Sequence, residues 1–260
     1  MKNFKDKIVV ITGATSGIGK ATGEMFKNLG ATVVCVARRK SDIFDSVQAD
    51  VTDNTQVDNA VNYIISKYGK VDILINNAGG GISGPIENTN FEDAKNLFNL
   101  NFFGGLYITQ AFLPHLRQGG KIVFVSSVAA IFPIPFQAFY SATKSAVSML
   151  GGALRMETRP LGISVSTVLP GDVKTGFTDA RIKTDGEDIY AKRAKKAVSA
   201  MEHDEKNGMS PEKVAKAIVN NCKRKNPPPQ KVVGLKYKFF AFLFRVLPTR
   251  TVQFILSKMY

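Results

Sequence analysis

Short apolar runs that alternate with helical patterns constrain the fold of this chain more than any other feature of its sequence. The runs rich in Val and Ile are residues 7–12, 32–37, 47–51, 71–76, 121–127 and 163–170. Runs of this length, bounded by Gly or Asp and separated by helices, are typical of βαβ units and of a parallel sheet buried on both faces. Since such crossovers are right-handed, the sequence predicts an α/β fold with a doubly wound parallel sheet of the Rossmann type.

Helical patterns fill the intervals between these runs. Two of them end near Leu29 and Tyr68, and two longer ones cover about 91–117 and 138–158. No linker or internal repeat interrupts the pattern, and a chain of this length commonly forms one α/β domain. We therefore expect 1–260 to be a single domain.

The last part of the chain departs from this alternation. The link from Asp172 to about Met209 is polar and irregular, which favours a mobile lid. Residues 226–230 form a stiff proline turn before a last short strand at 231–233. The chain is thus expected to divide into a core of about 1–175 and a covering segment of about 176–260.

Composition indicates a substantial core and a reducing compartment. Of the 260 residues, 44% are apolar. The only cysteines, Cys35 and Cys222, are far apart in sequence, and neither His115 nor His203 has metal-ligand spacing, so we expect no disulfide and no metal. No signal peptide and no apolar run of about 18 residues is present, so a cytoplasmic protein without a transmembrane helix is expected.

Positive charge is concentrated in the last quarter of the chain. The net charge is +14, of which residues 1–191 carry +2 and residues 192–260 carry +12. This charge alone suggests a nucleic-acid-binding protein, but no recognised binding motif accompanies it, so we expect no nucleic-acid partner. A steep salt dependence of binding to DNA or RNA would be needed to support that alternative.

A glycine-rich turn follows the first apolar run and opens the first helical pattern. In TGATSGIGKA (12–21), the glycines Gly13, Gly17 and Gly19 have the spacing G-x-x-x-G-x-G. Glycines allow a tight turn and close approach of the backbone, and a helix N-terminus offers free N–H groups to a pyrophosphate. An ordinary strand–helix turn is the alternative, but the strand before and the helix after favour a dinucleotide-binding site.

The end of the second strand indicates which dinucleotide binds. Sites selective for NAD carry an acidic residue there for the ribose 2′-hydroxyl. This chain has Ala37 at that place, followed by Arg38, Arg39 and Lys40. Guanidinium groups suit a 2′-phosphate by bidentate pairing. Although a solvated basic turn is the alternative, the missing acid and the added cations together favour NADP(H).

Seven motifs then combine into a family pattern. They are TGATSGIG (12–19), DV (50–51), NNAG (76–79), Asn101, Ser127, the Tyr140–Lys144 pair and PGDVKT (170–175). In this order and spacing they make the chain resemble the short-chain dehydrogenase/reductase family over at least residues 7–175. Only about nine residues separate Lys40 from Asp50, so the helix usual there in the family is expected to be trimmed or lost.

The resemblance assigns catalytic roles to four residues. Tyr140 and Lys144 are four residues apart and share one face of a helix, which is either a surface accident or an acid/base couple. The family pattern implies the second: Tyr140 is the acid/base, and Lys144 lowers its pKa from about 10 and binds the nicotinamide ribose. Ser127 would hold the substrate oxygen, and Asn101 would connect Lys144 through water to solvent.

The resemblance also implies a cofactor-binding set. Within it, the glycine turn would meet the pyrophosphate, and Ser16 would meet the 2′-phosphate beside Arg38. Residues 50–51 would flank the adenine, 77–79 would line the ribose and nicotinamide side, and 170–175 would hold the carboxamide. The complete predicted set is Gly13, Ser16, Gly17, Ile18, Gly19, Arg38, Arg39, Asp50, Val51, Asn77, Ala78, Gly79, Tyr140, Lys144, Pro170, Gly171, Val173 and Thr175.

Within the family, residues 84–117 and 126–147 look closest to hydroxysteroid and retinol-type members. The apolar stretch 131–139 is expected to line the cleft, although core packing is the alternative. These features predict an NADP(H)-dependent oxidoreductase that interconverts a secondary alcohol and a ketone on a hydrophobic, steroid-like substrate. A non-catalytic NADP-binding sensor or scaffold is the alternative function. Because 91–117 and 138–158 match the family's dimer helices, a homodimer or homotetramer is expected.

The segment 236–250 sets seven Phe, Leu and Val residues among lysines and arginines. It is too short to cross a bilayer, but a basic amphipathic helix with phenylalanines can lie in a membrane interface. The alternative is that the phenylalanines close the substrate cleft or pack at a subunit contact. We favour a segment that covers the cleft, with peripheral membrane contact as a second use.

Overall fold

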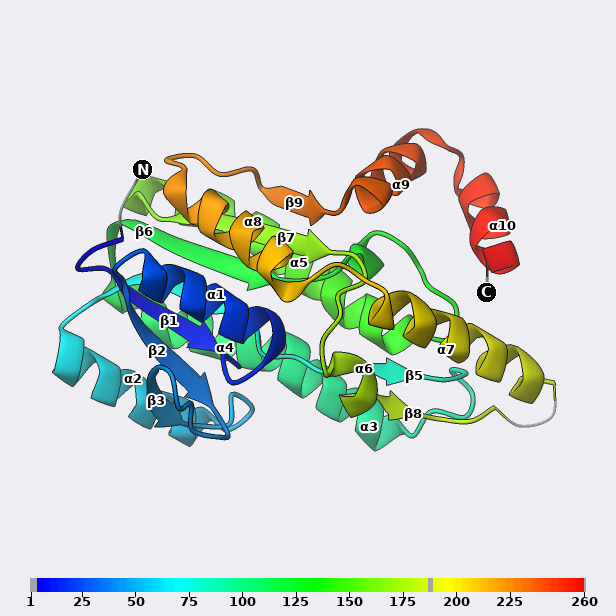
Figure 1. Cartoon of the computed structure of the whole chain (residues 1–260), viewed down its shortest axis with the longest axis horizontal. Coiled ribbons are helices and arrows are strands. Elements are labelled where there is room, and N and C mark those ends of the chain that lie inside the picture. The colour runs from blue at the N-terminus through cyan, green and yellow to red at the C-terminus, as the bar shows by residue number, and fades with distance from the viewer. Residues whose placement is uncertain (1–3, 187–188, 260) are drawn as a thin grey trace.

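The computed structural model describes residues 4–186 and 189–259, and its centre is a seven-stranded parallel sheet (Figure 1). The strand order is β3-β2-β1-β4-β6-β7-β9, and every neighbouring pair is parallel. The strands are β1 (Ile8–Thr12), β2 (Thr32–Ala37), β3 (Asp45–Gln48), β4 (Val71–Asn76), β6 (Leu116–Val125), β7 (Ser164–Pro170) and β9 (Gln230–Val233). The predicted Rossmann-type sheet in a single domain is confirmed.

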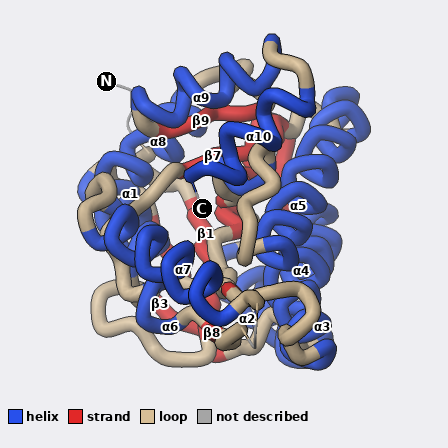
Figure 2. The backbone as a smooth tube through the Cα atoms, turned by 90° about the vertical axis from the view of Figure 1, so that its right-hand side faces the viewer, coloured by secondary structure: helices blue, strands red, loops and turns tan. Residues whose placement is uncertain are grey.

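Helices cover both faces of this sheet, as Figure 2 shows. The helices are α1 (Gly17–Asn28) and α8 (Pro211–Lys223) on one face, and α2 (Asn54–Tyr68), α4 (Gly104–Phe112) and α5 (Ala138–Glu157) on the other. Successive residues of β1 point to opposite layers, since Val9 belongs to the core under α1 and α8 and Val10 to the core under α2 and α4. Burial on both faces explains why the strands are continuous Val and Ile runs.

The strand order reverses at β1, because β2 and β3 lie on one side of it and β4 lies on the other. Loops that leave the carboxyl ends of the strands diverge at such a point, and ligands bind in the crevice between them. The loop between β2 and β3 contains no helix, as the short spacing from Lys40 to Asp50 predicts. The strand predicted at 47–51 lies earlier, at Asp45–Gln48, so Asp50 and Val51 belong to the loop that follows.

The helix predicted at 91–117 is interrupted in the structure. It consists of α3 (Phe91–Phe98), a π-helical turn (Asn99–Phe103), α4 and a 3₁₀ turn (Leu113–His115), and Leu116 already begins β6. A Cβ on Gly104 would lie 3.0 Å from the carbonyl oxygen of Val51, so only glycine allows this close approach of α4 to the loop after β3. The π-helical turn comes directly before this contact and contains Asn101.

The link from Asp172 to Met209 is more ordered than its composition predicts. It forms α6 (Phe177–Ala180), β8 (Ile182–Lys183), which pairs with β5 (Ile82–Ser83), and the 16-residue helix α7 (Ala191–Lys206). The prediction of an irregular segment is wrong. The apolar stripe of α7 is so narrow that it leaves little helical periodicity in the sequence. Its buried residues are Ala194, Ala197 and Met201.

Two helices, α9 (Leu235–Val246) and α10 (Thr249–Met259), follow β9 and project from one corner of the molecule in Figure 1. Tyr237, Phe240 and Phe244 of α9 pack against a small cluster that includes Phe132. Within the described residues, no helix is long and apolar enough to cross a membrane.

Candidate active site

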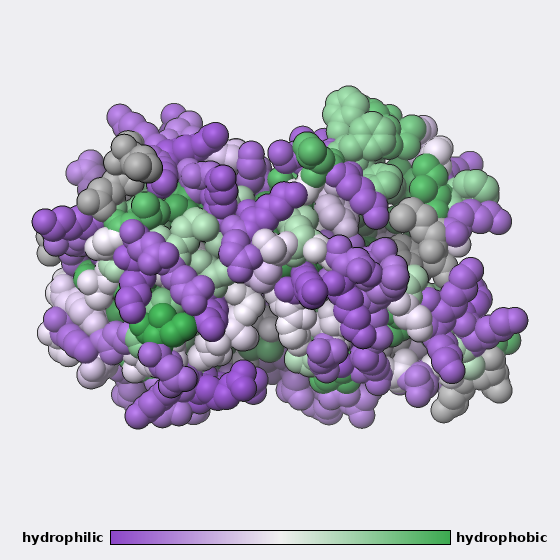
Figure 3. Space-filling view, in the orientation of Figure 1, coloured by the Kyte–Doolittle hydropathy of each residue, from purple (hydrophilic) through white to green (hydrophobic). Residues whose placement is uncertain are grey.

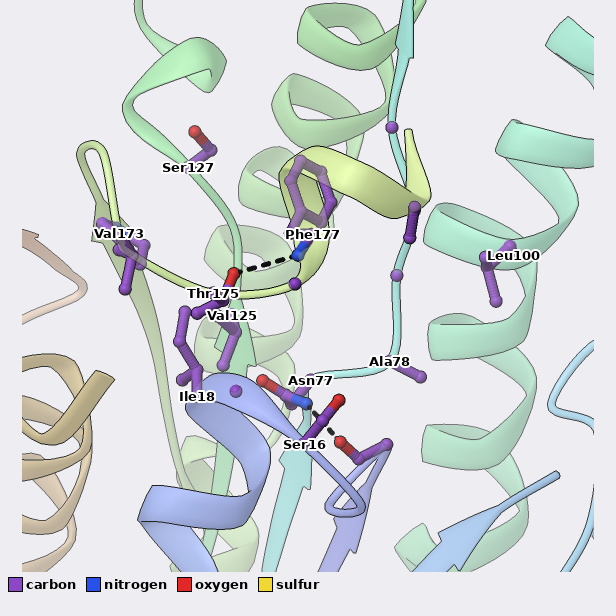
Figure 4. Close-up of a pocket in the computed structure, with 18 of the residues that line it drawn as sticks. Ser16, Ile18, Asn77, Ala78, Leu100, Val125, Ser127, Val173, Thr175 and Phe177 are labelled. Atoms are coloured by element: carbon purple, nitrogen blue, oxygen red, sulfur yellow. Dashed lines mark hydrogen bonds between the residues drawn. The ribbon is translucent and has the colours of Figure 1, made fainter. Parts of the chain in front are cut away.

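A cleft of about 570 Å³ opens at the carboxyl edge of the sheet (Figure 4). Every residue predicted to bind the cofactor lines this cleft except Gly19, and Ser127 lines it with them. These residues come from the loops after β1, β2, β3, β4, β6 and β7 and from α5. The parallel sheet thus brings motifs from distant parts of the sequence to one cavity.

The glycine turn packs against the start of the loop after β4. Gly13 and Gly17 have φ values of +69° and +54°, which favour glycine, and a Cβ on Gly13 would lie 3.1 Å from Cα of Ala78. A Cβ on Gly19 would lie 2.4 Å from the carbonyl oxygen of Gly13. Gly19 therefore packs inside the turn and does not line the cleft, and its contact with the cofactor stays a prediction.

Thr12 and Asn77 join the ends of β1 and β4. The Thr12 hydroxyl oxygen accepts hydrogen bonds from the backbone N–H groups of Asn77 and Ala78, both at 2.9 Å. Nδ2 of Asn77 donates to the carbonyl oxygens of Thr12 at 3.0 Å and Gly13 at 3.2 Å. Sequence reasoning missed Thr12, although its position between the strand and the first glycine is the signal that could have identified it.

The far end of the cleft suits a 2′-phosphate. Ser16, Arg38 and Arg39 line it together, and Ala37 leaves no carboxylate at the end of β2. Neither arginine forms a salt bridge with an acidic group in the described parts of the chain. Both guanidinium groups are exposed and free to pair with a phosphate, so the residues present fit NADP(H).

Ser127, Tyr140 and Lys144 meet on one wall of the cleft. Lys144 is buried on α5, its Nζ lies 5.7 Å from the centre of the Tyr140 ring, and it donates to the carbonyl oxygen of Val125 at 3.2 Å. The Ser127 hydroxyl lies near enough to the Tyr140 phenol to favour its ionised form, and it accepts a 3.1 Å hydrogen bond from the backbone N–H of Ala129. The predicted pairing of the phenol and the ammonium on one helix face is present in the structure.

Burial controls the ionisation of this pair. Desolvation raises the pKa of Tyr140 to about 12 and lowers the pKa of Lys144 to about 8. The Ser127 hydroxyl acts in the opposite direction on Tyr140 but is the smaller effect. Lowering of the pKa of Tyr140 by Lys144 together with the positive charge of an oxidised nicotinamide stays a prediction. Among the protein's own groups, the dense surroundings of both side chains disfavour both charges.

Asn101 lies behind the cleft wall and is held by three hydrogen bonds. Its Oδ1 accepts from the backbone N–H of Gly80 at 2.8 Å, and its Nδ2 donates to the Gly80 carbonyl oxygen at 3.1 Å and to Oγ1 of Thr143 at 3.0 Å. A Cβ on Gly79 would lie 3.0 Å from Oδ1 of Asn101 and 3.3 Å from Nζ of Lys144. Gly79 therefore allows Asn101 and Lys144 to lie close together.

The substrate side of the cleft differs from its prediction. Of the stretch 131–139, only Ile134 and Gln137 line the cavity, whereas Phe132 is buried against Phe244 of α9 with 4.5 Å between ring centres. Core packing, the stated alternative, therefore holds for Phe132. Residues 236–250 do not line the cleft.

Two residues of the link from Asp172 to Met209 line the cavity instead, and sequence reasoning missed both. Phe177 and Glu205 line the cavity, and the Phe177 ring lies 5.7 Å from the Tyr140 ring. The backbone N–H of Phe177 donates to Oγ1 of Thr175 at 3.2 Å, which ties α6 to the PGDVKT loop (Figure 4). Glu205 forms a buried salt bridge with Arg181.

Comparisons with known proteins agree with this geometry. The family model described as "short chain dehydrogenase" matches residues 7–186. A 3-ketodihydrosphingosine reductase of Bacteroides thetaiotaomicron is 40% identical over 99% of both chains. A dehydrogenase/reductase SDR family member 7B of Xenopus tropicalis is 30% identical over 98% of this chain and 86% of its own length.

Solved structures show the same fold. A short-chain dehydrogenase from Streptomyces avermitilis superposes with a TM-score of 0.83 at 30% identity, covering 97% of this chain and 95% of the other. A short-chain dehydrogenase/reductase from Burkholderia phymatum in complex with NAD superposes with a TM-score of 0.81 at 25% identity, covering 94% of each chain. The sheet, the cleft and the Ser127–Tyr140–Lys144 wall therefore identify this chain as an oxidoreductase of the short-chain dehydrogenase/reductase family.

Proposed function

We propose that this protein is an NADP(H)-dependent reductase that converts the ketone of a long-chain lipid base into a secondary alcohol. The observation that carries the proposal is the meeting of Ser127, Tyr140 and Lys144 beside a cavity with an apolar wall at Ile134 and Phe177. The relative named for 3-ketodihydrosphingosine supports a long-chain amino ketone over a steroid-like substrate. Arg38 and Arg39 support NADP(H).

The residues of the chain supply the proton and orient the carbonyl. The nicotinamide of the bound cofactor supplies the hydride to the carbonyl carbon, and the carbonyl oxygen must gain a proton. Ser127 and Tyr140 are placed to bind that oxygen, and the Tyr140 hydroxyl is the proton donor. With a pKa raised to about 12, Tyr140 is protonated near neutral pH, which suits an acid in reduction better than a base in oxidation.

The first prediction is NADPH-dependent turnover of a long-chain ketone. Purified protein should consume NADPH when 3-ketodihydrosphingosine is added, with a higher kcat/KM than for NADH. Arg38→Ala should lower kcat/KM for NADPH by about 10- to 100-fold, the range for one lost charge-assisted contact, and affect NADH much less. Arg159→Ala, which removes an exposed arginine outside the cleft, is the matched control. A wild-type preference for NADH would contradict the cofactor assignment.

The second prediction concerns the proton donor. Tyr140→Phe should lower kcat by at least about 100-fold, as expected for loss of a general acid, while the Kd for NADPH stays within about threefold. NADPH fluorescence titration measures binding, and NADPH absorbance measures the rate. Tyr63→Phe removes an exposed phenol on α2 and should keep wild-type turnover. Binding without turnover in the wild-type protein would instead support the sensor alternative.

Helix α9 has an exposed apolar stripe and carries lysines and an arginine, and both features support peripheral contact with an anionic membrane. Leu235, Phe239, Phe242 and Val246 recur every three or four residues and form an exposed apolar stripe, with Phe239 and Phe242 61% and 62% exposed. Figure 3 shows this apolar surface over α9. No Asp or Glu follows Glu212 in the sequence, so nothing acidic on this stretch opposes anionic lipid. We propose that α9 and α10 lie on the surface of an anionic bilayer.

The third prediction tests this contact with vesicles. The protein should pellet with phosphatidylglycerol vesicles at low salt, less so at high salt, and weakly with neutral phosphatidylcholine vesicles. Replacing both Phe239 and Phe242 with Ser should reduce pelleting about tenfold or more. Phe91→Ser changes an equally exposed phenylalanine on α3 and should keep it. Equal pelleting of the double variant, or a change in its oligomeric state instead, would contradict membrane docking.

The fourth prediction is a homodimer built on α4 and α5. Exposed apolar side chains on α5 and on the π-helical turn directly before α4 support the contact, since Phe103, Met149 and Met156 all lie more than half exposed. Light scattering at micromolar protein should give at least a dimer, and Met149→Glu with Met156→Glu should shift it towards a monomer. Ile86→Glu, at an exposed residue outside these helices, is the control. A monomeric wild-type protein would contradict this assembly.

A further inference from the structure

Asp172 is a carboxylate that lines the cleft. It follows β7 by two residues and lines the same cavity as Ser127 and Tyr140. Within the described residues, no lysine or arginine lies within 4.0 Å of it. Within the described residues, Tyr237 is the one side chain that hydrogen-bonds to this carboxylate, and its hydroxyl donates to Oδ2. Oδ1 therefore accepts from none of these side chains.

Two glycines allow this contact between Asp172 and Tyr237. A Cβ on Gly171 would lie 2.1 Å from ring atoms of Tyr237, and a Cβ on Gly234 would lie 2.8 Å from the same ring. Gly234 also has a φ of +102°, which side chains rarely adopt. The ring of Tyr237 therefore fills space that any other residue at Gly171 would occupy. The hydrogen bond from Tyr237 thus fixes the position of Oδ2 of Asp172.

The charges around Asp172 favour a cation there. Burial, together with Asp204 and Glu205 of α7, raises the pKa of Asp172, while Tyr237 and Lys236 of α9 act in the opposite direction. Glu205 is already neutralised, because one oxygen pairs with Arg181 and the other accepts a 2.6 Å hydrogen bond from Thr178. Asp50 also lines the cleft, but its Oδ1 accepts hydrogen bonds from the backbone N–H and the hydroxyl of Thr52. Asp172 is therefore the carboxylate that a bound cation would stabilise.

Asp172 also acts on the reacting end of the cleft. The charged groups that shift the pKa of Tyr140 are Glu205, Arg181 and Asp172. Since Arg181 and Glu205 neutralise each other, the charge of Asp172 remains available to a substrate whose carbonyl oxygen lies at Ser127 and Tyr140. The apolar side chains of Ile134 and Phe177 line the same cavity and suit an alkyl chain.

We propose that Asp172 determines substrate specificity by binding an ammonium group on the carbon next to the reacting carbonyl. The cleft would then select α-amino ketones with an alkyl chain over plain ketones of the same length. This inference rests on the proposed reductase function and adds the group that recognises the amine. A long-chain base such as 3-ketodihydrosphingosine carries its amino group on the carbon beside the ketone.

The test compares two short-chain ketones, which stay monomeric in solution, with and without the amino group beside the carbonyl. For the wild-type protein, kcat/KM with NADPH should be higher for the amino ketone. Asp172→Asn keeps the shape of the side chain and removes its charge. It should lower the ratio of the two kcat/KM values by about 10- to 100-fold, mainly through KM of the amino ketone.

Two controls separate the explanations. Asp179→Asn removes an exposed charge of α6 that does not line the cleft and should keep the wild-type ratio, and NADPH titration verifies that each variant folds. An equal loss for both ketones in Asp172→Asn would overturn the proposal and indicate a structural role. If the wild-type protein reduces neither ketone, the reductase function fails. In that case, calorimetry measures the affinity of the NADP⁺ complex for the matching amino alcohol. Equal affinities of the wild-type protein and Asp172→Asn would overturn the amine site.

Discussion

Close packing of α5 against β6 and β7 is the contact on which the site depends. A Cβ on Gly151 would lie 2.6 Å from Oγ1 of Thr167, so the helix can lie this near the sheet only with glycine at that position. The Ser126 hydroxyl donates to the carbonyl oxygen of Lys144 at 2.9 Å, and Nζ of Lys144 donates to the carbonyl oxygen of Val125. These contacts hold the ammonium beside the phenol and remove both from water.

That removal from water disfavours the charged form of both groups. The Tyr140 phenol, with a pKa raised to about 12, keeps its proton near neutral pH. The Lys144 ammonium, with a pKa lowered to about 8, loses its proton more readily than a lysine in water does. The protein alone therefore prepares an acid, and burial has a larger effect than the adjacent ammonium.

The C-terminal helices connect this chemistry to the surface. Tyr237 of α9 contacts Asp172 and Gly171 in the cleft loop, while Phe239 and Phe242 of the same helix face solvent. One short helix thus has one apolar face against the cleft wall and another on the outside. A helix with this arrangement can join a lipid surface to a site that takes a lipid substrate, which gives the proposed membrane contact a structural link to the proposed reaction.

The sequence by itself determined the parallel sheet, the glycine turn and the Tyr140–Lys144 pairing, because each depends on local periodicity or on spacing within one element. Tertiary structure decided the rest. Phe132 packs against α9 instead of lining the cleft, and Gly19 packs inside the glycine turn. Helix α7 forms although only three of its residues are buried. The pKa of Tyr140 rose because desolvation depends on every atom packed around a group, and Asp172 gained its place in the cleft because β7 and α9 meet there. Neither burial nor contact between distant segments can be read from the order of residues.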